Sequence, residues 1–362
     1  MTNKLRKCAE RMGGNGRLRA LSLIFVLVFS FSTLGIAQVT NGSAKKIPLY
    51  RNPVLDRDFP DPTVIKASDG FYYAYATQSV VGGVWRNIQV ARSVDLVNWA
   101  DVGDALPAKP SWANQTQNFW APHVTEAGGT YYMYYSADPN TRDGLCLAVA
   151  TSKSPAGPFA DKGSPLKCGA GFVNIDPMAF DDPATGKKYL FWGSGFQPIK
   201  VQELAANRID FQAGSQPTDL ILPVADPDPG SYRDLVEGAW VVFRNGYYYL
   251  FFSGDDCCTV AHYAVMVARA TSVTGPYIVF PQNNGVIVAG NLNWLGPGHN
   301  SVIRDEKSVD WLVYHAYRPE DRSRGRVMIM NRLLYGQDGW VRGEEGSPTC
   351  EVRVGPMPRA RF

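Results

Sequence analysis

Three acidic residues and a histidine, Asp61, Asp176, Glu237 and His299, recur along the chain at one position of a repeated pattern. In each copy the residue precedes a short apolar stretch, a turn and an aromatic-rich stretch, and Ala121 takes this position in a fifth copy. One such carboxylate alone would be interpreted as a turn residue or a solvated one. Three carboxylates and an imidazole brought together would repel one another and lose hydration, which proteins tolerate mainly where shifted pKa values are used. We therefore predict that these positions form a functional site.

A set of this kind is suited to general acid–base chemistry on an uncharged ligand. One protonated carboxyl can donate to a leaving oxygen while one ionised carboxylate activates water, and glycosidic bonds are hydrolysed in this way. Phe119, Trp120 and Trp294 lie beside the predicted site and could bind sugar rings, although each aromatic residue on its own is more often part of a core. Trp120 and Trp294 are expected to abut the rim of the site and are the better candidates.

The elements that must position these residues are the repeats themselves. Successive equivalent positions are 60, 55, 61 and 62 residues apart, starting from Asp61. Each copy contains hairpin signals, strand alternation and Gly, Asn or Asp turns, so the sequence predicts an all-β fold, a five-bladed β-propeller. A pair of β-sandwiches is the alternative, and the near-constant period disfavours it.

Propeller geometry explains why the repeated positions should converge. The first strand of each blade lines the central channel, so residues at the start of these strands meet at one rim. Pro60 and Pro62 restrict the backbone on either side of Asp61, which suits a carboxylate that must be aimed in one direction.

The first 37 residues are predicted to be a secretory signal peptide, which leaves residues 38–362 as a single propeller domain. An apolar run from Leu21 to Phe31 follows six basic residues, and Gly35 and Ala37 supply small residues before Gln38. The run is short for a membrane span, so an uncleaved anchor is the less favoured alternative. We expect a secreted or periplasmic monomer that has no membrane association after cleavage.

Charge and cysteine content set further limits. Removing the six basic residues and Glu10 of that segment changes the formal net charge from +3 to −2, and no basic run remains. We therefore expect no nucleic-acid partner. Five cysteines remain, an odd number, so one thiol is free or bonded elsewhere, and Cys146 and Cys168 are the expected disulfide. The adjacent Cys257 and Cys258 lack the spacing of a zinc site.

The repeated motifs resemble those of glycoside hydrolase family 43, the five-bladed propeller enzymes of arabinan and xylan breakdown. Counterparts there exist for F-P-D-P, F-W-A-P-H-V, N-I-D-P, V-E-G-A-W, G-P-G-H-N-S-V, Y-H-A-Y and the C-C pair after the fourth aromatic stretch. The resemblance covers nearly all of residues 38–362 and is closest to the α-L-arabinanases. It implies a plant cell-wall polysaccharide or arabino-oligosaccharide as the substrate.

Residue by residue, the resemblance implies that Asp61 is the general base, Glu237 the general acid, and Asp176 the group that raises the pKa of the acid and orients it. His299 matches a histidine that faces a metal, usually calcium, in the channel of arabinanases. Calcium prefers oxygen ligands, so this ion rests on the resemblance, and the alternative is a histidine that hydrogen-bonds a carboxylate without metal.

Two motifs depart from the family pattern. The acid motif reads E-G-A instead of E-A-P or E-G-P, and the closing D-R-L-x-W reads N-R-L-L-Y from Asn331. These departures concern the shape of the substrate site, so the linkage preference and endo or exo action stay open. An α-L-arabinofuranosidase or a β-xylosidase would keep the same carboxylates, and a non-catalytic sugar-binding propeller would be expected to lose one.

Overall fold

The computed structural model describes residues 48–225, 228 and 230–357, and the predicted signal peptide lies outside them. The described residues form strands and four short 3₁₀ turns, with no α-helix among them. The turns are Ser111–Ala113, Asn283–Gly285, Arg322–Arg324 and Glu344–Gly346. No helix in this part of the chain is long and apolar enough to cross a membrane.

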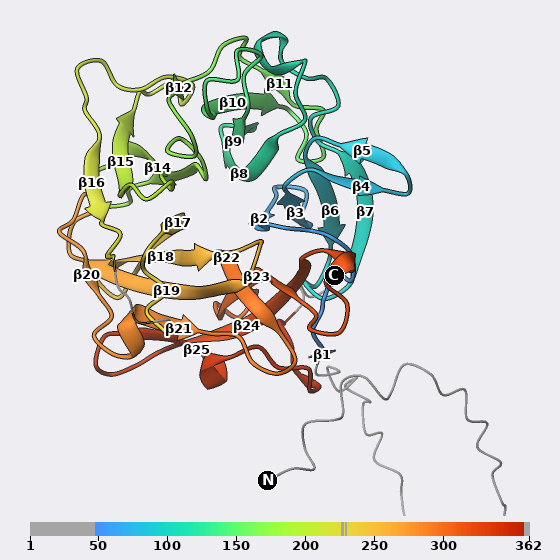
Figure 1. Ribbon diagram of the computed structural model, residues 1–362, viewed down its shortest axis with the longest axis vertical. Helices are drawn as coiled ribbons and strands as arrows, with labels where there is room; N and C mark the ends of the chain where they lie inside the picture. Colours follow the sequence, from blue (N-terminus) through green and yellow to red (C-terminus); the bar gives the residue numbers. More distant parts are fainter. Residues whose placement is uncertain (1–47, 226–227, 229, 358–362) are drawn as a thin grey trace, which may run out of the picture. The chain divides into compact units, whose positions relative to one another are not determined.

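Five antiparallel sheets follow one another along the chain and surround a common centre (Figure 1). The predicted five-bladed β-propeller is thereby confirmed. The first blade contains β2 (Thr63–Lys66), β3 (Tyr72–Ala76), β6 (Gln89–Ser93) and β7 (Trp99–Asp104). A separate hairpin leaves it between β3 and β6 and consists of β4 (Ser79–Val81) and β5 (Val84–Arg86).

The second and third blades are built in the same order. The second blade contains β8 (Phe119–Ala127), β9 (Thr130–Ala137), β10 (Cys146–Ser152), β11 (Ala160–Asp161) and β12 (Lys167–Cys168). The third contains β13 (Met178–Asp181), β14 (Lys188–Trp192), β15 (Ile199–Leu204) and β16 (Thr218–Ile221).

The last two blades complete the ring. The fourth blade contains β17 (Val236–Arg244), β18 (Tyr247–Asp256), β19 (His262–Ala270), β20 (Ile278–Val279) and β21 (Val286–Val288). The fifth contains β22 (Leu295–Arg304), β23 (Asp310–Tyr317), β24 (Val327–Tyr335) and β25 (Val341–Gly343). A small sheet of β1 (Leu49–Tyr50) and β26 (Arg353–Val354) joins the two ends of the described chain.

The hydrophobic core lies between neighbouring blades. In β3, Tyr73 and Tyr75 belong to the cluster shared with the second blade, whereas Tyr72, Ala74 and Ala76 belong to the cluster shared with the fifth. This division follows from the two-residue period of a strand. Because both faces of β3 are buried, the strand is apolar throughout, which explains the aromatic-rich stretch in each repeat.

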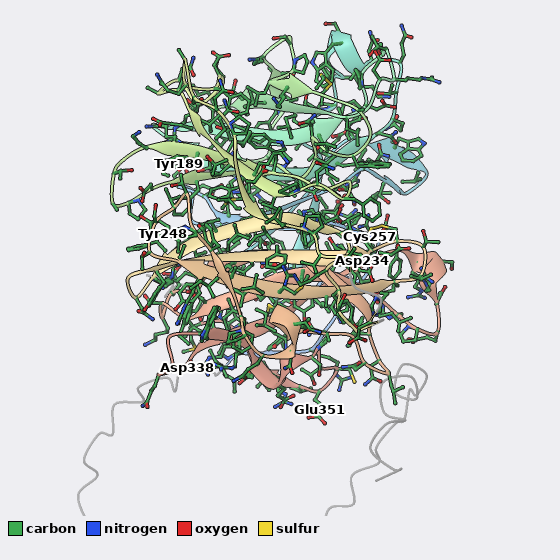
Figure 2. All side chains as sticks on the ribbon, turned by 60° about the vertical axis from the view of Figure 1, so that its left-hand side comes forward. Tyr189, Asp234, Tyr248, Cys257, Asp338 and Glu351 are labelled. Carbon is green, nitrogen blue, oxygen red and sulfur yellow. A yellow bond between two sulfur atoms is a disulfide. The ribbon has the colours of Figure 1, made fainter. Side chains whose placement is uncertain are left out.

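The same arrangement holds elsewhere in the ring. Tyr189 of β14 and Tyr248 of β18 lie where the third and fourth blades meet (Figure 2), within a cluster that spans three blades.

Two disulfides involve the cysteines considered above. Cys146 and Cys168 are bonded, as predicted, and they connect β10 to β12. Cys257 and Cys258 are bonded to each other after β18. No cysteine among the described residues is free.

Candidate active site

Five residues at equivalent places in the five blades adopt a left-handed backbone conformation. They are Asp61, Ala121, Asp176, Gly238 and His299, with φ between 46° and 62°. Each of these residues lies two positions before a residue of the inner strand that pairs regularly with the second strand. This pairing either begins at that residue or resumes there after a bulge. For a residue other than glycine this conformation costs roughly 1 to 3 kcal/mol, so the surroundings must impose it.

A repeated contact between blades holds this conformation. The backbone N–H of the left-handed residue donates to a side chain at the end of the second strand of the preceding blade. The four pairs are Ala121 with Thr77 Oγ1 (2.8 Å), Asp176 with Ser136 Oγ (3.1 Å), His299 with Ser253 Oγ (2.8 Å) and Asp61 with His315 Nδ1 (3.2 Å). Each blade therefore positions the site residue of the next.

The fourth blade departs from this pattern, and the sequence alignment was wrong there. Gly238, not Glu237, is the left-handed residue, and Glu237 stands one position earlier in the chain. In the third blade the hydroxyl is displaced by one residue as well. Gly193 stands at the place where the other blades carry a hydroxyl or an imidazole, and Ser194 is the next residue. The Ser194 hydroxyl donates to Glu237 Oε2 at 2.5 Å. The two displacements therefore bring Ser194 and Glu237 together.

The side chains of Asp61, Asp176 and His299 converge in the structure. His299 Nδ1 lies 3.5 Å from Asp61 Oδ1 and 3.8 Å from Asp176 Oδ2. Asp61 and Asp176 are buried, whereas Glu237 and His299 are partly accessible. The site can therefore expose its predicted acid to a ligand while it shields the other two carboxyls.

Asp61 is held in its ionised form. Arg326 Nη1 lies 2.8 Å from Asp61 Oδ1, and the Thr77 hydroxyl donates to Asp61 Oδ2 at 2.5 Å. Burial alone would raise the pKa of Asp61, but the charge of Arg326, with smaller contributions from His299 and His315, holds that pKa well below its usual range. A carboxylate in this state can accept a proton from water.

Glu237 has the opposite tendency. Burial raises its pKa, and the neighbouring charge of Asp61 acts in the same direction. The Ser194 hydroxyl and the Tyr263 hydroxyl, which donates to Glu237 Oε1 at 2.8 Å, oppose this rise without cancelling it.

Asp176 is linked to the acid through the backbone. The N–H of Gly238 donates to Asp176 Oδ2 at 3.1 Å. Burial, followed by the charges of Glu237 and Asp61, raises the pKa of Asp176 well above its usual range. Because the charge of Glu237 contributes to the raised pKa of Asp176, the two carboxyls titrate as a pair. The site thus combines one carboxylate held in its ionised form with two carboxyls whose pKa values are raised.

Burial favours the neutral form of both histidines of the site. Burial lowers the pKa of His299, and burial and Arg326 lower that of His315 to about 4. An unprotonated Nδ1 of His315 can accept the N–H of Asp61, which assigns the ring proton to Nε2.

Calcium was predicted beside His299, and the surrounding donors fit only an ion that keeps water ligands. Asn300 and Ser301, the next two residues, carry buried amide and hydroxyl atoms without a hydrogen-bond partner. Among the described residues, no group of three or more His, Cys, Asp or Glu could hold a metal ion directly. The Nδ1 atom of His299 faces Asp61 and Asp176 at distances longer than ordinary hydrogen bonds.

The three predicted sugar-binding aromatics differ in accessibility. Phe119 is fully buried, and Trp294 is 3% exposed with Arg318 over its ring, so neither predicted ring is accessible for stacking on a sugar in this structure. Trp120 is partly accessible, and its ring stacks on that of Phe172, which is 54% exposed. Only Trp120 therefore remains a candidate platform, with Phe172 as a neighbour that was not predicted.

Sequence reasoning missed the partners of the carboxyls: Thr77, Ser194, Tyr263, His315 and Arg326. A signal existed for three of them, since each repeat ends its aromatic stretch with Thr, Ser or His. No repeat marks Arg326 or Tyr263.

Comparisons with known proteins show the family of the chain. The family model described as "Glycosyl hydrolases family 43" matches residues 50–341. An extracellular endo-α-(1→5)-L-arabinanase of Bacillus subtilis is 28% identical over 77% of this chain and 86% of its own. An extracellular exo-α-(1→5)-L-arabinofuranosidase of Cellvibrio japonicus is 28% identical over 80% and 87%, respectively.

Other relatives widen the range of activities. A xylosidase/arabinosidase of Humicola insolens is 26% identical over 86% of this chain and 56% of its own. Among solved structures, a thermostable family-43 glycoside hydrolase is 31% identical, with a TM-score of 0.73 over 86% of this chain and 100% of its own. The family model covers most of the chain. The chain therefore belongs to the family 43 glycosyl hydrolases and is a glycoside hydrolase.

Proposed function

We propose that the protein hydrolyses α-1,5-linked L-arabinofuranosidic bonds of arabinan with inversion, with Asp61 as general base and Glu237 as general acid. The observation that carries this proposal is the opposite direction of the two pKa shifts within one site. Arg326 lowers the pKa of Asp61, and burial raises that of Glu237. Two titratable groups driven apart in this way are suited to separate acid and base roles.

The proposed reaction is a single displacement. Asp61 removes a proton from a water that attacks the anomeric carbon, and Glu237 protonates the departing glycosidic oxygen. Inverting enzymes need about 6.5 to 9.5 Å between the two carboxyls to admit this water. Asp176 accepts the N–H of Gly238 and thereby holds the backbone next to the acid. Its coupled carboxyl helps to keep a proton on the pair.

The substrate assignment draws on the relatives named as arabinan-cleaving enzymes, endo and exo. The accessible pair of Trp120 and Phe172 supports a saccharide ligand, because aromatic faces stack on sugar rings. The relative named as a xylosidase/arabinosidase makes a xylosidase or arabinofuranosidase activity the second candidate.

One experiment tests both the linkage and the mechanism. Purified enzyme is incubated with linear arabinan, branched arabinan and aryl glycosides of arabinofuranose and xylose, and the anomer first released is followed by NMR. We expect fastest turnover of linear arabinan and an inverted first product. A retained configuration would exclude Asp61 as general base, and a preference for aryl xylosides would replace the proposed substrate. The sizes of the first products separate endo from exo action.

We further propose a secreted or periplasmic location, a monomeric state and a calcium ion near His299. The relatives named extracellular and the predicted signal peptide support the location. His299 and the unpartnered polar atoms of Asn300 and Ser301 would hold the ion through its water ligands. When bound, it would add positive charge to the site.

A further inference from the structure

The acid Glu237 owes its position to two displacements of one residue each. In each blade, the first regularly paired residue of the inner strand has a partner on the second strand. Two residues after this partner, the first, second, fourth and fifth blades carry a hydroxyl or an imidazole. In the third blade this place belongs to Gly193, and Ser194 comes one residue later. In the fourth blade, the acid Glu237 comes one residue before Gly238, the residue with the left-handed backbone conformation.

We propose that Ser194 and Tyr263 are positioning residues for the acid, which together fix which oxygen of Glu237 carries the proton and hold it toward the substrate. This inference rests on the proposed role of Glu237 as general acid. It assigns to two further residues a function that none of the motifs predicts.

The two oxygens of Glu237 have different partners. Oε1 accepts from the Tyr263 hydroxyl at 2.8 Å, and Oε2 accepts from the Ser194 hydroxyl at 2.5 Å. Burial and the charge of Glu237 raise the pKa of Tyr263 well above its usual range, so this phenol stays protonated and is a donor to Oε1. Oε1 is then the accepting oxygen of the neutral carboxyl, and the acidic proton belongs on Oε2.

Ser194 can adapt to both states of Oε2. A serine hydroxyl can accept as well as donate, so it tolerates a protonated Oε2 and donates to the same oxygen after the proton has left. Each transfer to the leaving group would thus end with two hydrogen bonds to the new carboxylate. Hydrogen bonds to the charged form favour the loss of the proton.

Both partners are held rigidly. The ring of Tyr263 is 1% exposed and stacks on His315, with ring centroids 5.8 Å apart and planes within 3°. A Cβ on Gly298 would lie 2.1 Å from this ring, so only glycine leaves room for Tyr263 there. Ser194 is 1% exposed and follows Gly193, where a Cβ would meet the Pro198 carbonyl at 2.6 Å. Neither hydroxyl is therefore a flexible surface group.

Five residues around the ring influence the acid. Asp61 raises the pKa of Glu237, Arg326 lowers it, and Asp176 is coupled to it. Tyr263 and Ser194 lower it by hydrogen bonding. Loss of either hydroxyl should therefore raise the pKa of the acid, while Asp61, Asp176 and Arg326 stay in place.

The test compares leaving groups. Ser194→Ala, Tyr263→Phe and Glu237→Gln are assayed on aryl α-1,5-arabinotriosides whose phenols span a range of pKa. With poor leaving groups, we expect kcat/KM of the Ser194 and Tyr263 variants to fall roughly ten- to hundredfold. With activated phenols, which need little protonation, it should change little. The alkaline limb of the pH profile should move to higher pH in both variants, and Ser194→Thr should recover much of the loss, since threonine keeps a hydroxyl that can donate to Glu237 Oε2.

Ser253→Ala is the matched control, because this hydroxyl accepts the N–H of His299 in the repeated manner. Whatever its rate, its leaving-group dependence and alkaline limb should equal those of the unmodified enzyme. Equal losses on good and poor leaving groups, with an unmoved alkaline limb, would overturn the inference. If Tyr263→Phe does not fold, Ser194→Ala and Ser194→Thr decide alone.

Other results would contradict the proposed function and not the roles of Ser194 and Tyr263. A Glu237→Gln variant without leaving-group dependence would remove Glu237 as the acid. A preference for xylosides would change only the substrate, and the same series is then run on aryl β-xylosides.

Discussion

The N–H of Gly238 donates to the Asp176 carboxylate at 3.1 Å, where the equivalent N–H in the other blades meets a hydroxyl or an imidazole. Ser194 is not available for it, because its hydroxyl is bound to Glu237. A carboxyl has thus taken the structural place of a hydroxyl in the fourth blade. This substitution places two coupled carboxyls next to each other in a buried setting, which should affect stability as well as chemistry.

We predict that Asp176→Asn makes the protein more stable at neutral pH while it lowers activity severely. An asparagine can still accept the N–H of Gly238 and does not ionise. A carboxyl whose pKa is raised on folding lowers stability above its unfolded-state pKa of about 3.9, so the gain should appear as pH rises and vanish near pH ~3. Melting temperatures across this range measure it.

Asp310→Asn is the control of opposite sign. Although burial acts against it, Arg244 and Arg304 lower the pKa of Asp310, so its ionised form stabilises the fold above its unfolded-state pKa. This variant should be less stable at neutral pH, and the difference should shrink as pH falls. An Asp176→Asn protein that is destabilised at neutral pH would contradict the raised pKa of Asp176.

We predict that Arg326→Gln moves the acidic limb of kcat/KM to higher pH. The guanidinium lowers the pKa of Asp61, and the base must be ionised to act, so its loss should reduce activity more at acidic than at neutral pH. Arg304→Gln, which alters an ion pair with Asp310 instead, should leave this limb in place. An unmoved acidic limb in Arg326→Gln would mean that another group sets it.

The period of the repeats made the fold predictable, because one copied pattern of apolar and aromatic strands is enough to specify five blades. The same period predicted that Asp61, Asp176 and His299 would meet. It could not reveal the displacement at Glu237, since a shift of one residue leaves the spacing of about 60 residues almost unchanged.

Burial and long-range partners were also beyond the sequence. Phe119 and Trp120 are adjacent and aromatic, yet only Trp120 is accessible, because successive side chains of a strand point to opposite faces. Arg326 reaches Asp61 across 265 residues of sequence, and no local pattern marks such a contact.

These two aromatic neighbours give a paired prediction. Trp120→Ala should raise KM with little change in melting temperature, because the ring is partly accessible and stacks on exposed Phe172. Phe119→Ala should instead reduce the free energy of unfolding by about 3 to 5 kcal/mol, since it removes a fully buried ring. Denaturant unfolding and Michaelis–Menten kinetics distinguish them. An unchanged KM in Trp120→Ala would remove this residue from the substrate site.

The Cys146–Cys168 disulfide should contribute measurably to stability. It closes a segment with a sequence separation of 22, and loops of this size lose about 2 to 4 kcal/mol of stabilisation when the bond is removed. Replacing both cysteines by alanine should lower the denaturant midpoint accordingly. The double alanine variant of Cys257 and Cys258 is the control, since that bond closes no loop and should add little chain-entropy stabilisation. Equal effects in the two variants would rule out this explanation.

The calcium proposal predicts a lower melting temperature after exhaustive chelation, restored by calcium. His299→Ala should lower the melting temperature and abolish the response to calcium, because its imidazole is the proposed contact. Elemental analysis of the purified protein gives the occupancy. Fully active protein without bound metal would leave His299 with a hydrogen-bonding role toward Asp61 and Asp176.

The pairing of Leu49 with Val354 has a practical meaning for protein engineering. The first and last strands of the described chain are neighbours, so a short linker could join them, and new ends could be opened at the Gly128–Gly129 turn, where added atoms meet nothing within 4 Å. In such a circular permutant the genetic order of the blades changes while the ring stays the same. A cargo domain could then be fused at the new ends, in the turn between β8 and β9, without rebuilding the contacts between blades that aim the carboxyls.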